Sequence, residues 1–402
     1  MSIRFAFDEI DTVLTDRDAD VFGHISNPHE DIIDAIEQRR PDYLKGDLSR
    51  DGSATVSYFT GQFEVLPATE TELGTVRGSR TVFGDLSGRE IKDIPYLTID
   101  FDDRPATLDE AFQKMRAVRQ FFGWMIGYAP RWREVSVFTF PRVDDGYRAD
   151  DEGNRDVGLE VFSPIEWQSA YYDERNRGWP GALIDLSREP EHFANTMREW
   201  LRRNRDGRRE GANAKFFKSM PGIGTADAAD GICSAANMFD LLPAEDKPSM
   251  PSLSAHVDSI LRGARMRIRE LDDLDTEERE EVLSGIGRIR AHVGLRDIIE
   301  RRANVVLEHA GEERLPNIQD VVRAAVICRN YYTHGTEVAG IDCTDMSVVM
   351  FLTRTLEVIY GVSELIQCGW DVEKWFDKPG MSHPFEKYMN SYRRHLTMAG
   401  LA

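Results

Sequence analysis

The chain has 402 residues, 41% hydrophobic and 30% charged, a composition typical of a globular protein with a buried core. Its formal net charge of −20 argues against broad wrapping of nucleic acid by a basic surface, but leaves room for a small basic cleft. No apolar run reaches the roughly 18 residues of a membrane span, no secretory signal is evident, and the four cysteines form no CxxC pair, so a reducing cytoplasm is the expected location.

The first half of the chain is predicted to be rich in strands. One strong helix is expected at 107–127, where Thr107 and Glu110 form a capping-box pattern and apolar residues recur at helical spacing from Ala111 to Phe122. An exposed acidic loop is expected at 143–156. The strand segments are short, rich in β-branched and aromatic residues and bounded by Gly, Pro or Asp; they are residues 53–61, 77–88, 95–103, 133–143 and 157–167.

The second half is predicted to be almost entirely helical. Asn317 is a plausible N-cap for one of these helices, with Asp320 in its first turn. The Arg- and Gly-rich residues 202–211 predict an exposed loop before the helical region. The helical segments, the third of which contains breaking glycines, are residues 227–243, 253–271, 276–311, 317–335 and 345–370.

These patterns predict an α+β protein in three parts. A β-rich N-terminal domain with a sensing or regulatory role covers 1–165, a connecting helical and loop segment covers 166–226, and a helical domain covers 227–402.

An arginine followed by a histidine after four to six residues occurs three times, at Arg17/His24, Arg302/His309 and Arg329/His334. About 2.8 such pairs are expected by chance, so the spacing alone identifies nothing. On a straight helix Arg302 and His309 share a face, whereas Arg329 and His334 lie about 140° apart. Asn330 and His334, which are four residues apart, do lie on the same face of such a helix.

The residues around the third pair are distinctive. The stretch RNYYTHG, 329–335, resembles the signature of the HEPN superfamily: Arg, a polar residue that is often Asn, three further residues, then His, often followed by Gly. Its place late in a helical region, before a long apolar helix, also resembles that superfamily over roughly 227–400. A β-rich half ahead of such a domain resembles ApeA-type anti-phage proteins in arrangement.

The resemblance implies an all-α HEPN bundle at the C-terminus and a ribonuclease that needs no metal or other cofactor. In that chemistry the RNA 2′-hydroxyl attacks its own phosphate, leaving a 2′,3′-cyclic phosphate and a 5′-hydroxyl. His334 would move the proton, Arg329 would stabilise the charge on the phosphate, and Asn330 would orient either group. The resemblance further implies a homodimer and a role in anti-phage defence that restrains growth, set off by a phage-derived trigger.

Three other interpretations stay open. The motif could make only capping or tertiary hydrogen bonds, or it could belong to a non-catalytic HEPN module that holds RNA or a protein. A HEPN toxin paired with a separate nucleotidyltransferase antitoxin is disfavoured, because that class usually carries Tyr two residues after the His, where this chain has Thr336.

Weaker candidate sites lie outside the motif's charged residues. Tyr331, next to Tyr332, could stack on a base or be buried. Arg202, Arg203 and Arg205 could bind RNA, although a solvated loop is the simpler interpretation. The segment 24–31 contains His24, His29, Glu30 and Asp31, residue types that bind metals, but the spacing fits no established ligand pattern and a polar turn is favoured.

Overall fold

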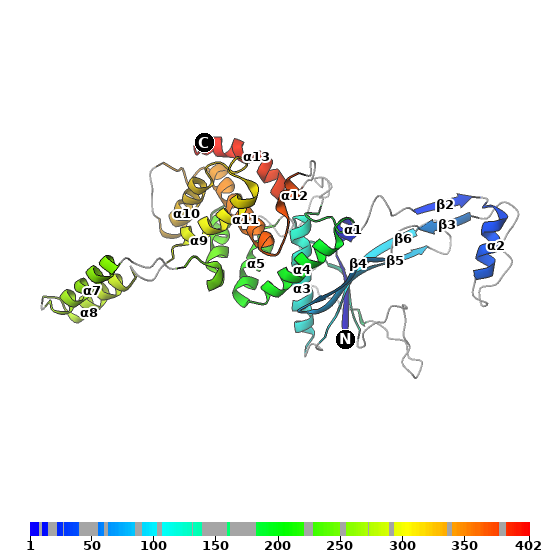
Figure 1. The fold of residues 1–402 in the computed structure, drawn as a ribbon, viewed down its shortest axis with the longest axis horizontal. Helices are drawn as coiled ribbons and strands as arrows, with labels where there is room; N and C mark the ends of the chain where they lie inside the picture. The colour runs from blue at the N-terminus through cyan, green and yellow to red at the C-terminus, as the bar shows by residue number, and fades with distance from the viewer. Residues whose placement is uncertain are drawn as a thin grey trace. The chain divides into compact units, whose positions relative to one another are not determined.

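The computed structural model of the protein has an α+β fold that divides into two compact units (Figure 1). Unit 1 comprises residues 1–126, 130–169 and 179–202, and unit 2 comprises 127–129, 170–178 and 203–402. The structure describes residues 1–7, 10–14, 22–26, 28–39, 55–59, 63–84, 91–102, 107–130, 132–138, 159–160, 182–220, 228–249, 255–271, 273–288, 293–335, 340–377 and 383–402.

A six-stranded antiparallel sheet forms the centre of unit 1, with strand order β4-β5-β6-β1-β7-β8. All residues of the central strand β1 are buried except the half-buried Arg4, which is the pattern of a strand in the interior of a sheet. The strands are β1 (Ser2–Phe7), β4 (Glu64–Thr71), β5 (Gly74–Gly84), β6 (Ile91–Asp100), β7 (Trp132–Phe138) and β8 (Leu159–Glu160).

Two helices build the core of unit 1. Helix α3 (Leu108–Ile126) packs on the sheet, where the rings of Phe122 and Phe7 meet edge to face at 5.5 Å. Helix α4 (Pro190–Asn204) packs against α3 through aromatic pairs such as Trp200 and Trp124, whose centroids are 5.7 Å apart. Thr107 accepts a hydrogen bond from the Glu110 amide at 3.2 Å, so the predicted helix start is confirmed.

The predicted strands all have counterparts: β3 (Thr55–Phe59) and β8 lie within their expected segments, and β5, β6 and β7 overlap theirs but begin one to four residues earlier. The sequence interpretation missed β1, β4 and β2 (Phe22–Ser26), the last of which pairs with β3 in a separate two-stranded sheet. The short helices α1 (Asp11–Leu14) and α2 (Glu30–Arg39) complete the N-terminal elements. The acidic loop expected at 143–156 lies outside the described residues.

Unit 2 is a bundle of helices around α11 (Met346–Gln367), which contacts five other helices. Gly361 allows this packing, because a Cβ there would lie 2.6 Å from the rings of Phe216 and Phe385. The surrounding elements are α5 (Gly207–Ser219), α6 (Ala228–Asp240), η3 (Ala244–Asp246), α9 (Leu295–Ala310), α10 (Ile318–His334), α12 (Val372–Phe376) and α13 (Pro384–Met398).

Helix α11 is long and apolar enough to cross a membrane by length and composition, in contrast to the expectation from the sequence. However, 78% of its most apolar 18-residue window is buried inside the structure, and it carries the buried charge of Glu364. Both features are those of the core helix of a bundle.

Helix boundaries in the second half differ from the sequence interpretation at three places. The segment 276–311 is broken at Gly294 into α8 (Thr276–Arg288) and α9. Asn317 precedes α10 as expected, but its backbone is left-handed, with φ 57°, and its side chain donates to the Leu401 carbonyl instead of capping. Helices α12 and α13 follow α11, which was expected to be the last helix.

The loop expected at 202–211 is instead a tight junction between two helices. Helix α4 ends at Asn204, and Asp206 caps α5 by accepting hydrogen bonds from the amides of Arg208 and Arg209, each at 3.0 Å. A single capping aspartate therefore allows a helix to begin in this glycine- and arginine-rich stretch. Composition alone does not show such a local signal.

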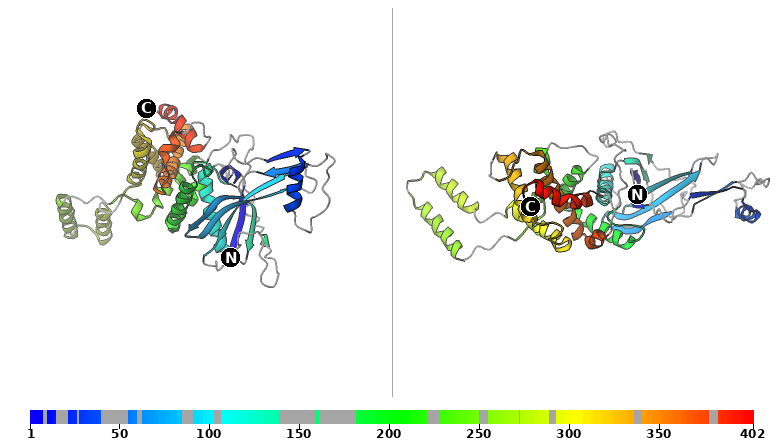
Figure 2. Two further views of the ribbon diagram at one scale, coloured as in Figure 1. Left: turned by 45° about the vertical axis from the view of Figure 1, so that its right-hand side comes forward. Right: turned by 90° about the horizontal axis from the view of Figure 1, so that it is seen from above.

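Helices α7 (Ala255–Arg269) and α8 pair with each other as an antiparallel helical hairpin. Figure 2 shows them side by side in both of its views. The segment 243–252 before α7 contains the short helix η3 and is described as far as residue 249.

Candidate active site

The residues of the motif lie in the last turns of α10. Gly335 follows the helix with φ 69°, and its amide donates to the Tyr331 carbonyl at 2.8 Å. The left-handed backbone conformation is strained for residues with a Cβ but not for glycine, which explains why a glycine follows the histidine. His334 is thereby fixed as the final residue of the helix, and its side chain is exposed to solvent.

Arg329 is held where α10 meets α6. Its Nη1 donates to Asn330 Oδ1 at 3.1 Å, and its Nη2 lies 4.0 Å from Oδ2 of Asp240 at the end of α6. The Nε of Arg329 is buried and has no hydrogen-bond partner among the described residues. The guanidinium is therefore positioned by neighbours but retains donor capacity, which is how a group that binds an anion must be arranged.

Arg329 and His334 are not joined to each other within the structure. No hydrogen bond among the described residues connects the histidine to Arg329 or to Asn330, although Asn330 is one helical turn from it. This agrees with the angle of about 140° between positions five apart on a helix. One copy of the motif therefore presents its two charged groups in different directions.

Two other side chains of the motif, Tyr332 and Thr333, are fixed by contacts that the sequence did not reveal. The Tyr332 hydroxyl donates to the Cys343 carbonyl at 2.7 Å, and Thr333 Oγ1 donates to the Arg329 carbonyl at 2.8 Å and lies 3.6 Å from Cys233 Sγ. Tyr331 meets the Tyr332 ring edge to face at 5.2 Å, and both are half-buried. Tyr332 is thus anchored by its hydroxyl, whereas Tyr331 is the tyrosine that remains for a ligand.

A buried thiol lies beneath the same turn. Cys328 is fully buried, and burial together with the neighbouring Cys343 and Cys233 raises the pKa of its thiol to about 12. A thiol with such a pKa is protonated at neutral pH and is a poor nucleophile. The residue preceding Arg329 therefore contributes packing and not reactivity.

In the competing pair, Arg302 and His309, the arginine has a structural role. Arg302 is completely buried and donates through Nη2 to Glu364 and through Nη1 to Gln367. His309 is exposed on the same helix, where its Nδ1 lies 3.4 Å from Glu373. The two positions are seven apart on one helix, but the Arg302 guanidinium is buried whereas the His309 side chain is exposed.

Arg302 belongs to what we call the arginine–glutamate cluster, formed by Arg203, Arg209, Asp246, Arg302, Glu364 and Gln367. Arg209 binds both Glu364 oxygens, at 2.8 and 2.9 Å, and also pairs with Asp246. Arg203 Nε lies 3.2 Å from Glu364 Oε1. Burial alone would raise the pKa of Glu364, but the three arginines lower it to about 2, so the carboxylate is charged throughout the physiological range.

The three arginines considered for RNA binding lie in different settings. Arg203 is committed to the arginine–glutamate cluster, where burial opposes its charge and Glu364 raises its pKa. Arg202 is exposed and forms a bidentate pair with Glu199 of the same helix, at 2.7 and 2.6 Å. Arg205 is exposed in the short turn between α4 and α5. Although these three arginines are close in sequence, they do not form one exposed basic patch.

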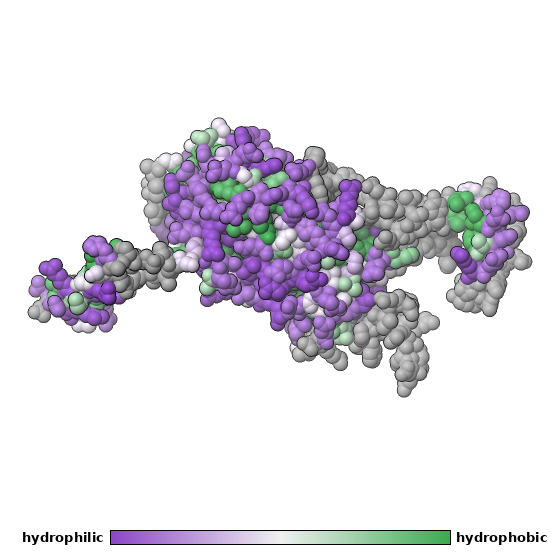
Figure 3. Space-filling model, viewed as in Figure 1, coloured by the Kyte–Doolittle hydropathy of each residue, from purple (hydrophilic) through white to green (hydrophobic). Residues whose placement is uncertain are grey.

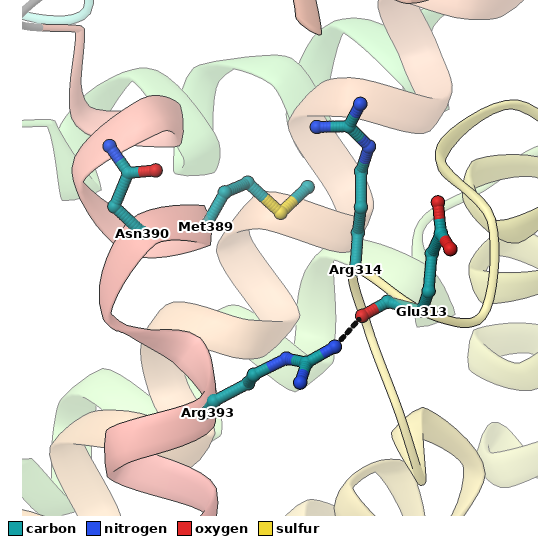
Figure 4. Close-up of a pocket in the computed structure, with 5 residues that line it drawn as sticks. All are labelled: Glu313, Arg314, Met389, Asn390 and Arg393. Carbon is teal, nitrogen blue, oxygen red and sulfur yellow. Dashed lines mark hydrogen bonds between the residues drawn. The ribbon is translucent and has the colours of Figure 1, made fainter.

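A surface cavity of about 400 Å³ lies away from the motif, between the α9–α10 connection and α13 (Figure 4). Arg393 donates to the Glu313 carbonyl at 2.5 Å and Arg314 packs over the Phe376 ring, so both arginines are already engaged. The cavity is near the start of α10, roughly 16 Å along the helix from Arg329 at 1.5 Å per residue. It is lined by Glu313, Arg314, Met389, Asn390 and Arg393 and includes no motif residue.

The metal-type residues near the N-terminus form a local polar contact. His29 Nδ1 lies 3.1 Å from Asp31 Oδ2 at the exposed start of α2. The side chain of His24 lies outside the described residues, as does Thr336. Within the described part of the chain, no group of three or more His, Cys, Asp or Glu side chains is arranged to hold a metal ion.

Comparison with known families assigns the central part of unit 2. Residues 234–374 match the family described as Apea-like HEPN, a range that includes α9, α10 and α11 and the whole motif. No curated protein and no solved structure matches the chain. Domains of the HEPN family are generally associated with nucleases and with defence, they typically bind RNA, and they often form dimers.

Proposed function

We propose, because residues 234–374 match the Apea-like HEPN family, that the chain is a metal-independent endoribonuclease of anti-phage defence that cleaves RNA at its Arg329–His334 motif. The observation that carries the proposal is the state of Arg329. Its side chain is 19% exposed, and its guanidinium is oriented by the bond to Asn330 and by Asp240 at 4.0 Å. The remaining N–H groups of its terminal nitrogens can therefore donate to a phosphate oxygen.

The proposed reaction is an internal transesterification. His334 accepts the proton of the RNA 2′-hydroxyl, whose oxygen then forms a bond to the adjacent phosphorus while the bond to the 5′-oxygen breaks. Arg329 stabilises the negative charge that gathers on the phosphate, and Asn330 keeps the guanidinium oriented. The leaving 5′-oxygen takes up a proton, so the products are a 2′,3′-cyclic phosphate and a 5′-hydroxyl, with no water consumed in this step.

A second copy of the chain would complete the site. One motif supplies a single histidine, whereas the reaction needs one group to take a proton and another to give one. The same histidine and arginine from a symmetric partner would provide the acid and additional positive charge across a two-fold axis. This composite arrangement also explains why Arg329 and His334 of one copy need no contact with each other.

Only part of the apolar helix that follows the motif is available for that contact. Most of α11 is buried as the core of unit 2. The exposed part is its first two turns, where Met346 and Met350 lie one turn apart and Arg354 follows on the same face. We therefore assign the dimer contact to the end of α10 together with the start of α11.

A second candidate is a HEPN module that holds RNA without cutting it. The hydrogen bonds of Arg329 to Asn330 and of Thr333 to the Arg329 carbonyl favour it, because they give the motif a structural use in the absence of catalysis. The two functions share the phosphate contact and differ in the need for His334. A cytoplasmic location, a growth-restraining role and a phage-derived trigger accompany the first proposal.

The deciding experiment compares the wild-type chain with His334→Ala and with His309→Ala, an exposed histidine on a neighbouring helix. Total RNA and a defined single-stranded RNA are incubated with each protein, and cells carrying each gene are challenged with phage. We expect cleavage with cyclic phosphate ends, and protection, from wild type and His309→Ala only. Undiminished cleavage by His334→Ala would overturn the enzyme proposal, and RNA binding without cleavage by wild type would favour the binding module.

A further inference from the structure

The hairpin formed by α7 and α8 exposes apolar side chains that nothing in its own structure covers. None of its described side chains is buried. Leu261 and Ile268 of α7 and Leu283 and Ile286 of α8 are half-buried, which marks the line along which the helices meet. Outside that line the exposed fractions are 37% for Val257, 56% for Ile260, 43% for Leu271 and 42% for Val282.

These exposed residues lie on one face of the hairpin. At about 100° per residue, Val257 and Ile260 lie about 60° apart around α7, and Leu271 follows two residues after the helix ends. Ile260 is offset by about 90° from the half-buried line of α7, and Val282 is offset by about 70° in the same sense from that of α8. Because the helices run antiparallel, offsets in the same sense point to the same side. Figure 3 shows apolar side chains on this otherwise polar segment.

The two helices also carry opposite charge. Helix α7 contains four arginines and one aspartate, whereas α8 contains four glutamates and two arginines. Arg267 and Glu281 are exposed, and neither has an ion-pair partner among the described residues. An identical hairpin turned about an axis parallel to the helices would place each basic α7 against the acidic α8 of the other copy, with the apolar faces between them.

We propose that the α7–α8 hairpin is a self-association surface that pairs with the hairpin of a second copy of this chain as an antiparallel four-helix contact. Val257, Ile260, Leu271 and Val282 form its centre, and contacts such as Arg267 with Glu281 of the second copy select the arrangement. The face measures roughly 20 Å by 20 Å from the helix lengths, which is small for a stable interface. The association is therefore weak and depends on concentration, and it does not rest on the proposed RNA cleavage.

The first test uses sedimentation velocity of the full chain over a wide concentration range. Ile260→Glu places a charge in the apolar face, and Met266→Glu is the matched control, since Met266 is 61% exposed on the same helix but at least about 120° from the face. We expect Ile260→Glu to weaken association at least tenfold and Met266→Glu to leave it unchanged. Equal association of wild type and Ile260→Glu would overturn the proposal, and would leave the face to a different partner.

The second test separates contacts between copies from ion pairs within one hairpin. Arg267 lies about 20° from Ile260 around α7, and Glu281 lies about 100° from Val282, at the outer edge of α8. Arg267→Glu gives a chain whose α7 and α8 are both acidic at this border, and Glu281→Arg gives one in which both are basic there. Each variant alone is expected to associate more weakly than wild type, and an equimolar mixture to recover mixed assemblies, since every contact between the two variants is then complementary. If the mixture associates no more strongly than the separate variants, these charges interact only within one hairpin, which would contradict the proposal.

Discussion

Arg329 donates a hydrogen bond through Nη1 to Oδ1 of Asn330, the next residue of the chain, at 3.1 Å. An arginine and an asparagine adjacent on a helix rarely share a face, and here the side chains bend toward each other at the junction with Asp240. The bond uses one N–H of Nη1, so the guanidinium is oriented while its other terminal N–H groups can still donate to a ligand.

We predict that cleavage depends on the forked geometry of Arg329. Arg329→Ala should lower the cleavage rate about 100-fold or more, the size of effect seen when a single charge-stabilising donor is removed. Arg329→Lys should retain only part of the activity, because lysine keeps the charge without the fork. The matched control is Arg323→Ala on an exposed turn of α10, where the arginine pairs with Asp320 at 3.0 Å. Equal loss of activity in the control would contradict this assignment.

Arg302 should matter for folding and not for chemistry. Arg302→Ala leaves Glu364 buried with one arginine fewer, and breaking a buried ion pair costs about 3–5 kcal/mol. His309→Ala should change the free energy of unfolding by less than about 0.5 kcal/mol, since the residue is exposed. Urea titrations measure both. The RNA cleavage rate per folded molecule should stay near wild type in each, and loss of that rate in a stable His309→Ala protein would restore this pair as a candidate site.

The arginine–glutamate cluster predicts a specific loss of stability in acid. The pKa of Glu364 is lowered from 4.5 to about 2 in the folded chain, so its charge stabilises the native state above pH 4.5. That contribution is lost as the pH falls from about 4.5 to about 2. Urea midpoints measured across this range should fall more steeply for wild type than for Glu364→Gln, provided that this variant folds; Glu373→Gln, at an exposed carboxylate, is the control. Parallel profiles would show that Glu364 is not the group responsible.

Cleavage should need no divalent metal. We expect RNA to be cut at the same rate in excess EDTA, because the proposed site relies on Arg329 and His334 for charge and proton transfer. The product ends should carry a 2′,3′-cyclic phosphate, identified by mass spectrometry. Loss of activity in chelator that a divalent ion restores would indicate a different nuclease mechanism.

Mixing two inactive variants tests the composite site. Arg329→Ala and His334→Ala homodimers each lack one kind of charged group entirely, whereas a mixed dimer has one arginine and one histidine on opposite copies. We expect the mixture to cleave RNA measurably faster than either variant and well below wild type. Rates that merely add, or a monomer that cuts RNA at the full rate, would exclude a site shared between two chains, though not cleavage itself.

The sequence determined the features that depend on near neighbours in the chain. The helix start at Thr107, the helix carrying RNYYTHG and its end at Gly335 were all predicted, because caps, periodicity and a left-handed glycine act within a few residues. The α+β class followed from the same local patterns. The family could be proposed from one short motif, because its flanking Asn330 and Gly335 are far rarer by chance than the Arg–His spacing.

Only the tertiary structure decided which residues are committed to the interior. Arg302 and Arg329 both precede a histidine by a few residues, yet Arg302 is fully buried and bound to a glutamate 62 residues away, whereas Arg329 lies at a helix junction with part of its side chain exposed. The central position of β1 depends on its pairing with β6 and β7, residues about a hundred positions distant. Such pairings depend on which apolar surfaces meet and which charges are removed from water, and these quantities are set by contacts between distant segments, not by any local pattern.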